Sequence, residues 1–186
     1  MQTYDAWFKR FHWVSALLIL GLLVGGFLMP GVGGEVGKIR LYGCHVLLGI
    51  VLLGVTLARI LRRSTRATPE ALPMGRIHHF GMEAVHALLY VGLLILTGTG
   101  LGMLFLTELP QVLRTELGPI PDFSSLMPRR VHGFVARIYI ALVLAHVAGV
   151  LRYQIFDGDT LARMGVRMSF RRFGGSVGGS VDTNDH

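Results

Sequence analysis

Four long apolar runs dominate the pattern of hydrophobic and polar positions along the chain. They cover about residues 8–29, 41–61, 84–106 and 131–151, and polar segments separate them. Each run is close to the roughly 20 residues that an α-helix needs to cross the hydrocarbon core of a bilayer. A helix of a soluble protein would carry a polar stripe at the helical period, and these runs lack one. The pattern therefore predicts an all-α membrane protein, an up-down bundle of four transmembrane helices.

A cleaved signal peptide is an alternative for the first run, because the basic residues Lys9 and Arg10 precede it. Its apolar stretch is longer than the roughly 7–15 residues of a signal peptide, and no A-x-A-like cleavage site follows it. We therefore expect the first run to be retained as a helix.

The basic residues are unevenly divided between the two sides of the predicted bundle. The chain is 52% hydrophobic, in keeping with membrane spans. An even number of spans, here four, places both termini on the same side. Of the 18 lysines and arginines, twelve lie on the side of the termini, five on the other, and Arg137 within the fourth span. This bias predicts that both termini lie in the cytoplasm. The net charge of +7 then favours contact with anionic lipid, and no soluble module with a basic face indicates nucleic-acid binding.

The polar segments complete the predicted organisation, with residues 1–164 as the membrane domain. The outer connection 107–130 has four prolines and is predicted to hold a short surface helix at PQVLRTEL. The inner connection before the third span is expected to expose His78 and His79 to solvent. The segment RYQIFDGDTLARMGVRMSFRRF, basic and partly amphipathic, is expected at the inner headgroup layer. The remainder of the 165–186 tail is rich in glycine and serine and is predicted to be disordered.

Five histidines lie near the ends of the predicted spans. His45 and His132 lie at the outer ends of the second and fourth spans. His12, His86 and His146 lie at the inner ends of the first, third and fourth spans. Ionisable side chains inside a span are costly and usually mark function. The alternative is a scattered set of interfacial histidines, but their placement predicts an outer layer and an inner layer.

His132 and His146 are fourteen positions apart in the fourth span. Fourteen residues of α-helix rise about 21 Å and make nearly four whole turns, so both side chains leave one face at two depths. Each can then meet a histidine of another helix at its own level. Neutral imidazole is a standard axial ligand of haem iron, so the arrangement predicts two stacked bis-histidine haems. His45 is at the level of His132, whereas spacing leaves both His12 and His86 as partners for His146.

Two other kinds of cofactor site fit the sequence less well. The chain has no C-x-x-C-H motif, which excludes the usual covalent attachment of a c-type haem. Its only cysteine is Cys44, so no internal disulfide can form. A structural zinc site would gather four ligands at one level. The predicted cofactor is therefore non-covalent haem b.

Arginines and glycines within the spans each have two interpretations. Arg59 is predicted either to anchor the second span at the inner surface or to meet a propionate of the inner haem. Arg137 is about 140° round the helix from His132, so it is off the ligand face and either snorkels outward or pairs with a propionate. The glycines of the first three spans either leave room for a flat macrocycle or allow close helix packing. They are Gly21, Gly25, Gly26, Gly43, Gly49, Gly54, Gly98, Gly100 and Gly102.

Four segments together resemble the bacterial cytochrome b561 family, in order and over roughly residues 4–164. They are YDAWFKRFHWVSALLIL, CHVLLGIVLLGVTLARILRR, VHALLYVGLLILTGTGLGM and VHGFVARIYIALVLAHVAGVLRYQIFDGDTLARM. The most specific features are HW opening the first helix, H-x-L-L-Y opening the third, the His-x13-His of the fourth, and D-x-L-x-R-M after it.

The resemblance implies a di-haem inner-membrane cytochrome that carries electrons between a periplasmic donor and the quinone pool. A superoxide-oxidising, ubiquinone-reducing activity occurs in the family, so a quinone-linked oxidoreductase of that type is one expectation. The resemblance selects His12 with His146 for the inner haem, and His45 with His132 for the outer one. It leaves His86 as a neighbour of bound quinone, where a histidine can pass protons.

The chain departs from the family pattern in the third span, where Thr97 stands in place of a proline. We therefore expect a straighter helix there. The outer segment 107–130 is the least family-like part, and the electron donor stays open. Two further functions compete with the first: a haem b membrane anchor of a hydrogenase- or formate-dehydrogenase-type complex, and a small transporter with histidines along a proton path.

Overall fold

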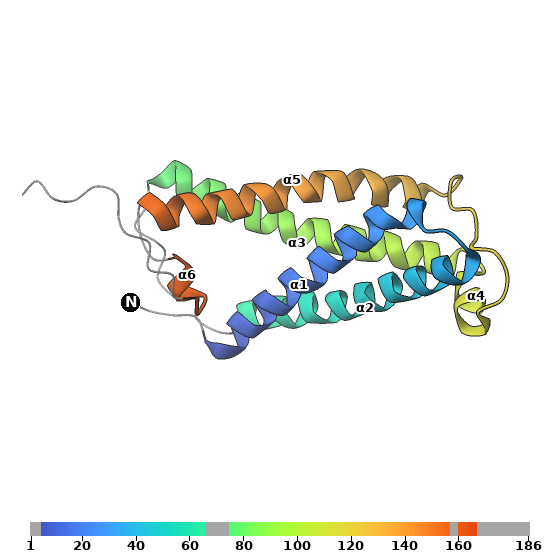
Figure 1. Ribbon diagram of the computed structural model, residues 1–186. Coiled ribbons are helices and arrows are strands. Elements are labelled where there is room, and N and C mark those ends of the chain that lie inside the picture. The colour runs from blue at the N-terminus through green and yellow to red at the C-terminus, as the bar shows by residue number, and fades with distance from the viewer. Residues whose placement is uncertain (1–4, 66–74, 157–159, 167–186) are drawn as a thin grey trace, which may run out of the picture.

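Four long helices run side by side in the structure, a computed structural model that describes residues 5–65, 75–156 and 160–166 (Figure 1). They are α1 (Ala6–Leu28), α2 (Glu35–Thr65), α3 (Arg76–Phe105) and α5 (Met127–Phe156). All four are long and apolar enough to cross a membrane. A 3₁₀ turn (Met29–Gly31), α4 (Leu109–Thr115) and α6 (Thr160–Arg163) complete the described elements. The predicted all-α architecture with four candidate transmembrane helices is confirmed.

The helices extend beyond the predicted apolar runs. The second run was predicted at 41–61, whereas α2 has 31 residues and ends at Thr65. A helix of that length is about 46 Å long, which exceeds the hydrocarbon core of about 30 Å and reaches through both headgroup regions. Hydropathy therefore located the part of each helix that crosses hydrocarbon, and the polar turns at the ends continue the same hydrogen-bond ladder.

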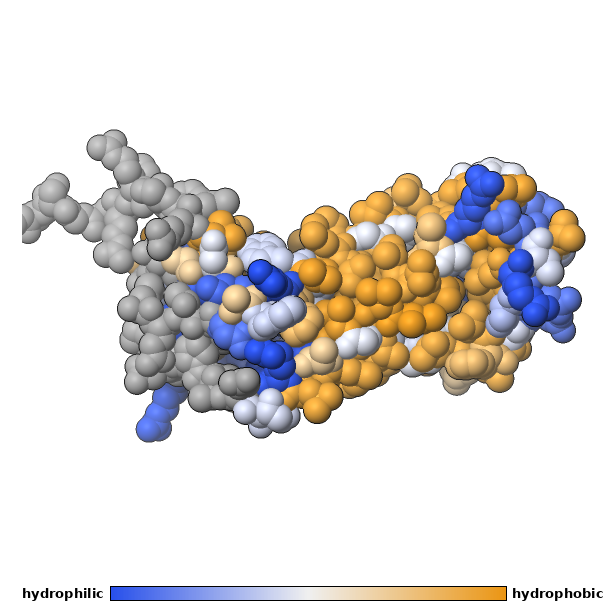
Figure 2. Space-filling model, turned by 90° about the horizontal axis from the view of Figure 1, so that it is seen from below, coloured by the Kyte–Doolittle hydropathy of each residue, from blue (hydrophilic) through white to orange (hydrophobic). Residues whose placement is uncertain are grey.

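The surface and interior have the polarity expected of a membrane protein. Large apolar side chains face outward, with Leu17 70% and Phe27 84% exposed. Figure 2 shows these side chains as an apolar belt between two polar ends. Conversely, Ser15 and Thr56 are buried, and each hydroxyl donates to the backbone carbonyl four residues earlier in its helix. Hydroxyls satisfied in this way can lie between helices without an unpaired donor.

The segment around α4 covers one end of the bundle, which we call the outer end. Leu109 and Val112 of α4 are buried there, and the ring of Phe123 stacks on Tyr42 of α2 at a centroid distance of 5.9 Å. The short helix predicted at PQVLRTEL is therefore present. Its apolar residues face α2 and α3, so the predicted surface helix is packed onto the bundle on one side.

The opposite, inner end is held together by residues of both termini. Asp5 caps α1 by accepting from the backbone N–H of Phe8, and it also pairs with Arg62 of α2. Both interactions hold the pKa of Asp5 below its usual range, and the hydrogen bond from the Phe8 N–H has the larger effect. The Trp13 indole N–H donates to the backbone carbonyl of Met164 at 3.1 Å. The HW motif therefore contacts the D-x-L-x-R-M motif directly.

Gln154 makes the second link between the long helices and α6. Its side-chain oxygen accepts from the backbone N–H of Leu161 at 2.9 Å, and the residue is buried. An amide that accepts from the first turn of a helix satisfies one of its unpaired N–H groups. α6 is thereby fastened across the inner end, as Figure 1 shows. Residues 167–186, where the disordered tail was predicted, lie outside the described residues.

The expected position of two histidines is corrected. His78 and His79 were placed in the connection before the third span, but α3 begins at Arg76 and includes both. His78 is exposed as predicted, whereas His79 is half-buried and lies 3.7 Å from Glu83 one turn later. The start was predicted too late because the polar side chains lie beyond the apolar run that hydropathy detects, and no proline occurs between Pro73 and Pro110 to interrupt the helix.

The centre of the bundle is a small apolar core. Leu52 of α2, Leu93 of α3 and Tyr139 of α5 are buried, and Ile19 of α1 packs against them. The ring of Tyr139 lies directly over the backbone of Gly92, where a Cβ atom would be 2.8 Å from the ring carbon Cδ2. Glycine is therefore required at this position for α3 and α5 to approach each other with tyrosine between them.

Replacing Gly92 with alanine is expected to destabilise the protein by roughly 1–3 kcal/mol, because overfilling a packed interior forces the Tyr139 ring or the helix backbone to move. The thermal unfolding of the detergent-solubilised protein measures this change. Gly98→Ala is the matched control on the same helix, since nothing lies within 4 Å of a Cβ at Gly98. Equal unfolding temperatures for the two variants would contradict the role of Gly92.

Candidate functional site: two layers of imidazoles

Five histidines from the four long helices meet at two levels of the bundle. At the outer level, the ring centroids of His45 on α2 and His132 on α5 are 6.3 Å apart. At the inner level, His146 on α5 lies 6.3 Å from His12 on α1 and 5.1 Å from His86 on α3. All five side chains are half-buried. The residues that spacing placed at common depths are thus close in space, while their role as ligands stays a prediction.

The fourteen-residue interval of α5 recurs in every long helix. Counting fourteen positions onward leads from His12 to Gly26, from His45 to Arg59 and from His86 to Gly100. Each long helix therefore presents one position to each level, about 21 Å apart and on nearly the same face. The inner level holds three histidines and an arginine, whereas the outer level holds two histidines and two glycines.

The two glycines lie against the outer imidazoles. A Cβ at Gly26 would be 3.6 Å from Cε1 of His45, and a Cβ at Gly100 would be 3.8 Å from Cε1 of His132. No side chain therefore occupies the space beside either ring at these two positions. Thr99 lies next to Gly100, and its hydroxyl oxygen is 3.1 Å from Nδ1 of His132.

Arg59 lies among the inner histidines. Its guanidinium is over the rings of Phe8 and Tyr90, at 5.8 and 5.4 Å from their centroids. It is within electrostatic range of His12, His86 and His146. Its buried Nε atom has no hydrogen-bond partner among the described residues. Of the two interpretations of Arg59, the surface anchor is therefore disfavoured, because an anchor would extend toward the headgroups.

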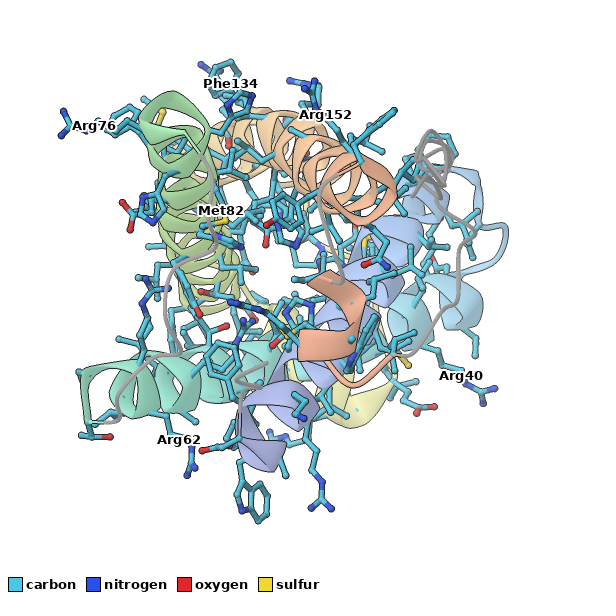
Figure 3. All side chains as sticks on the ribbon, turned by 90° about the vertical axis from the view of Figure 1, so that its left-hand side faces the viewer. Arg40, Arg62, Arg76, Met82, Phe134 and Arg152 are labelled. Atoms are coloured by element: carbon cyan, nitrogen blue, oxygen red, sulfur yellow. The ribbon has the colours of Figure 1, made fainter. Side chains whose placement is uncertain are left out.

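Three other arginines at the inner end point away from this group, whereas Arg63 is within electrostatic range of His86 and Arg59. Figure 3 views the bundle from that end, and Arg62, Arg76 and Arg152 extend outward from their helices. Met82, one turn before His86 on α3, lies on the side of its helix that faces the interior. Arg59 differs from these three because its guanidinium lies between the helices, over the rings of Phe8 and Tyr90.

The paired histidines fit a metal held between two imidazoles. Because metal–imidazole bonds are about 2 Å long, rings bound on opposite sides of one metal have centroids roughly 6 Å apart. His45 with His132 and His12 with His146 both match that separation. In addition, Nδ1 of His45 is buried and has no hydrogen-bond partner within the described part of the chain. Gly26 and Gly100 keep side chains out of the space beside the outer rings, as the binding of a flat macrocycle would require.

Three residues weighed in the sequence lie away from the two levels. Arg137 is exposed on α5 and off the ligand face, as the helical angle predicted. His78 is exposed, and His79 faces Glu83. These positions favour snorkelling for Arg137 over contact with a propionate.

Sequence reasoning overlooked Thr99, Tyr90 and Tyr139, which contact site residues. Tyr90 lies under Arg59, and Tyr139 is another of its electrostatic neighbours. The fourteen-residue interval, applied to all four spans instead of one, would have indicated the neighbourhood of Gly100 and hence Thr99. Tyr90 ends the H-x-L-L-Y motif and Tyr139 lies midway between His132 and His146, but neither was singled out because aromatic residues within an apolar run are usually part of the core.

The fold and the two levels define an all-helical membrane protein with paired imidazoles in its interior. The family model described as prokaryotic cytochrome b561 matches residues 3–165. The chain therefore belongs to the prokaryotic cytochrome b561 family, whose members are haem b proteins of membrane electron transfer. No curated protein and no solved structure matches the chain. Family and apolar helices together indicate a multi-pass protein of the inner membrane.

The purified protein is expected to carry haem b that is held without a covalent bond, because the family binds haem b and the sequence has no C-x-x-C-H motif. Extraction with acidified acetone should therefore remove all the haem, and a pyridine haemochrome spectrum should identify it as haem b. Haem that remains with the protein after extraction would contradict this expectation.

Proposed function

We propose that the chain binds two haem b groups and carries electrons across the inner membrane between a periplasmic donor and the quinone pool. The observation that carries the proposal is the pair of imidazole levels with equal ring separations of 6.3 Å. His45 and His132 would hold the outer haem, and His12 and His146 the inner one. When bound, haem b supplies reversible one-electron chemistry, while the protein supplies ligands, burial and charge.

Ring separation supports His12 over His86 as the partner of His146. The 5.1 Å between the centroids of His86 and His146 is shorter than two metal–imidazole bonds require, whereas the 6.3 Å of His12 equals the separation of the outer pair. His86 is then a neighbour of the inner haem without binding its iron. Reduction of a quinone to a quinol takes two electrons and two protons, and a histidine at that position can pass the protons.

Arg59 supports the inner haem in a different way. Its guanidinium is inside the bundle at the inner level, and no carboxylate lies within salt-bridge distance of it among the described residues. A haem propionate is an anion that would pair with it by charge-assisted hydrogen bonds. The proposed orientation, with both termini cytoplasmic, follows from the excess of basic residues on the α6 side. Electrons would then enter near α4 and leave toward quinone near α6.

Replacing His12 with alanine is expected to remove the inner haem and leave the outer one, so the haem content should fall from two per chain to one. His86→Ala should keep both haems but slow electron exchange with ubiquinone by about 10-fold or more, because the proton route is lost. Haemochrome quantification measures the first effect. Stopped-flow reoxidation of the reduced haems by a soluble ubiquinone measures the second.

The reverse result, in which His86→Ala loses a haem and His12→Ala loses none, would make His86 the ligand. His78→Ala is the matched control, since this exposed histidine of α3 faces neither level. Superoxide is the first periplasmic donor to test in the same assay. A stable complex with an iron–sulfur subunit on purification would favour the alternative of a membrane anchor for a hydrogenase- or formate-dehydrogenase-type enzyme.

Arg59→Met is expected to lower the midpoint potential of the inner haem by tens of millivolts. A positive charge favours the reduced haem, and one charge at roughly 8 Å contributes about 2 kcal/mol at an effective dielectric constant of about 20. Arg59→Lys should keep most of the potential. A spectroscopic redox titration measures both, and Arg62→Met, three residues away and directed outward, should leave the potential unchanged. A loss of potential in Arg62→Met as large as in Arg59→Met would refute a specific role for Arg59.

A further inference from the structure

The hydroxyl group of Thr99 connects α3 to the outer histidine of α5. Its oxygen is 3.1 Å from Nδ1 of His132 and 2.7 Å from the backbone carbonyl oxygen of Ile95, four residues earlier in α3. A second carbonyl, that of Leu96, is 3.0 Å away. The hydroxyl has one proton to donate and lone pairs to accept with. These contacts determine in which direction each proton points.

The Thr99 hydroxyl donates its proton to the backbone carbonyls of α3. A carbonyl oxygen can only accept, so an approach of 2.7 Å is a hydrogen bond only if Thr99 donates there. The hydroxyl oxygen must then accept from His132, which puts a proton on Nδ1 of that ring. The backbone of Leu96 is also a hydrogen-bond partner of the His132 ring. Both partners belong to α3, so the N–H of the imidazole faces that helix.

We propose that Thr99 is the positioning residue of the outer haem site: by accepting from Nδ1–H of His132, it keeps the lone pair of Nε2 available for the iron and fixes the plane of the ring. The proposal rests on the proposed function, in which His132 is an axial ligand. Histidines that bind metals almost always donate their other N–H to an acceptor, which orients the ring and raises the basicity of the ligand.

His45, the other proposed ligand of the outer haem, has no comparable partner, so the contact with Thr99 distinguishes His132. Nδ1 of His45 is buried without a hydrogen-bond partner in the described residues. Among the described residues, orientation of the outer pair therefore depends on α3, through the Thr99 hydroxyl and the Leu96 backbone at His132. Thr97, two residues away, makes the same bond to its own helix, from its hydroxyl to the Leu93 carbonyl at 2.8 Å, and has no hydrogen bond to a histidine of the described residues. It is a natural control for any effect of a threonine on α3 itself.

Thr99→Val keeps the size of the side chain and removes the acceptor. Both haems should remain bound in this variant. The midpoint potential of the outer haem should rise, because a less basic imidazole stabilises oxidised iron less. Transfer of that haem to apomyoglobin should be about 10-fold faster or more. The inner haem should keep its potential. Thr99→Ser should restore both properties, and Thr97→Val should resemble the wild type.

Low-temperature electron paramagnetic resonance assigns the two haems, since the low-spin signal lost in His132→Ala belongs to the outer one. An unchanged outer potential and transfer rate in Thr99→Val would overturn the proposal, and so would a Thr99→Ser variant as defective as Thr99→Val. If His132→Ala instead keeps two haems, the ligand assignment of the proposed function is wrong, and this result separates that failure from a failure of Thr99.

Discussion

Every long helix returns to the same face of the bundle after seven residues, and this repeat determines what each level contains. Seven residues make almost two turns and rise about 10 Å. The middle positions of the fourteen-residue intervals are Ile19, Leu52, Leu93 and Tyr139, which are the residues that meet in the apolar core. The two imidazole levels are therefore held apart by one layer of packed side chains. A change that shifted one helix by a residue would displace all three layers at once.

The levels differ in the residues that α1, α2 and α3 present to them. At the outer level, Gly26 and Gly100 keep the space beside His45 and His132 clear, and Thr99 supplies the orienting contact. At the inner level the corresponding positions carry His12 and His86, and Arg59 adds a buried positive charge. A low-dielectric interior makes such a charge effective over a longer distance than water would. In the proposed function, the outer level accordingly holds one haem, and the inner level holds one beside a quinone that takes up protons.

Hydropathy and spacing predicted much of this arrangement because both are one-dimensional signals of helices in a bilayer. Apolar runs located the four spans, and the interval from His132 to His146 indicated two depths. The choice between His12 and His86 could not be predicted in the same way, since depth along the axis says nothing of distance across the bundle. The early start of α3 at Arg76 was missed as well, because polar helical turns in the headgroup layer have no apolar signal.

Arg59 illustrates how a basic residue near the end of a span can be interpreted in two ways, as a surface anchor or as part of a site between the helices. By charge and depth it is indistinguishable from the arginines that orient membrane proteins, and Arg62 and Arg63 follow it in the same helix. Arg59, fourteen residues after His45, leaves α2 about 40° from the direction of His45, whereas Arg62 is about 60° further away and pairs with Asp5. Arg63 shares the direction of His45, but it lies one turn nearer the end of α2 and is exposed. Direction therefore separates Arg59 from Arg62, and exposure separates it from Arg63, so that Arg59 is the arginine of α2 that lies among the inner histidines.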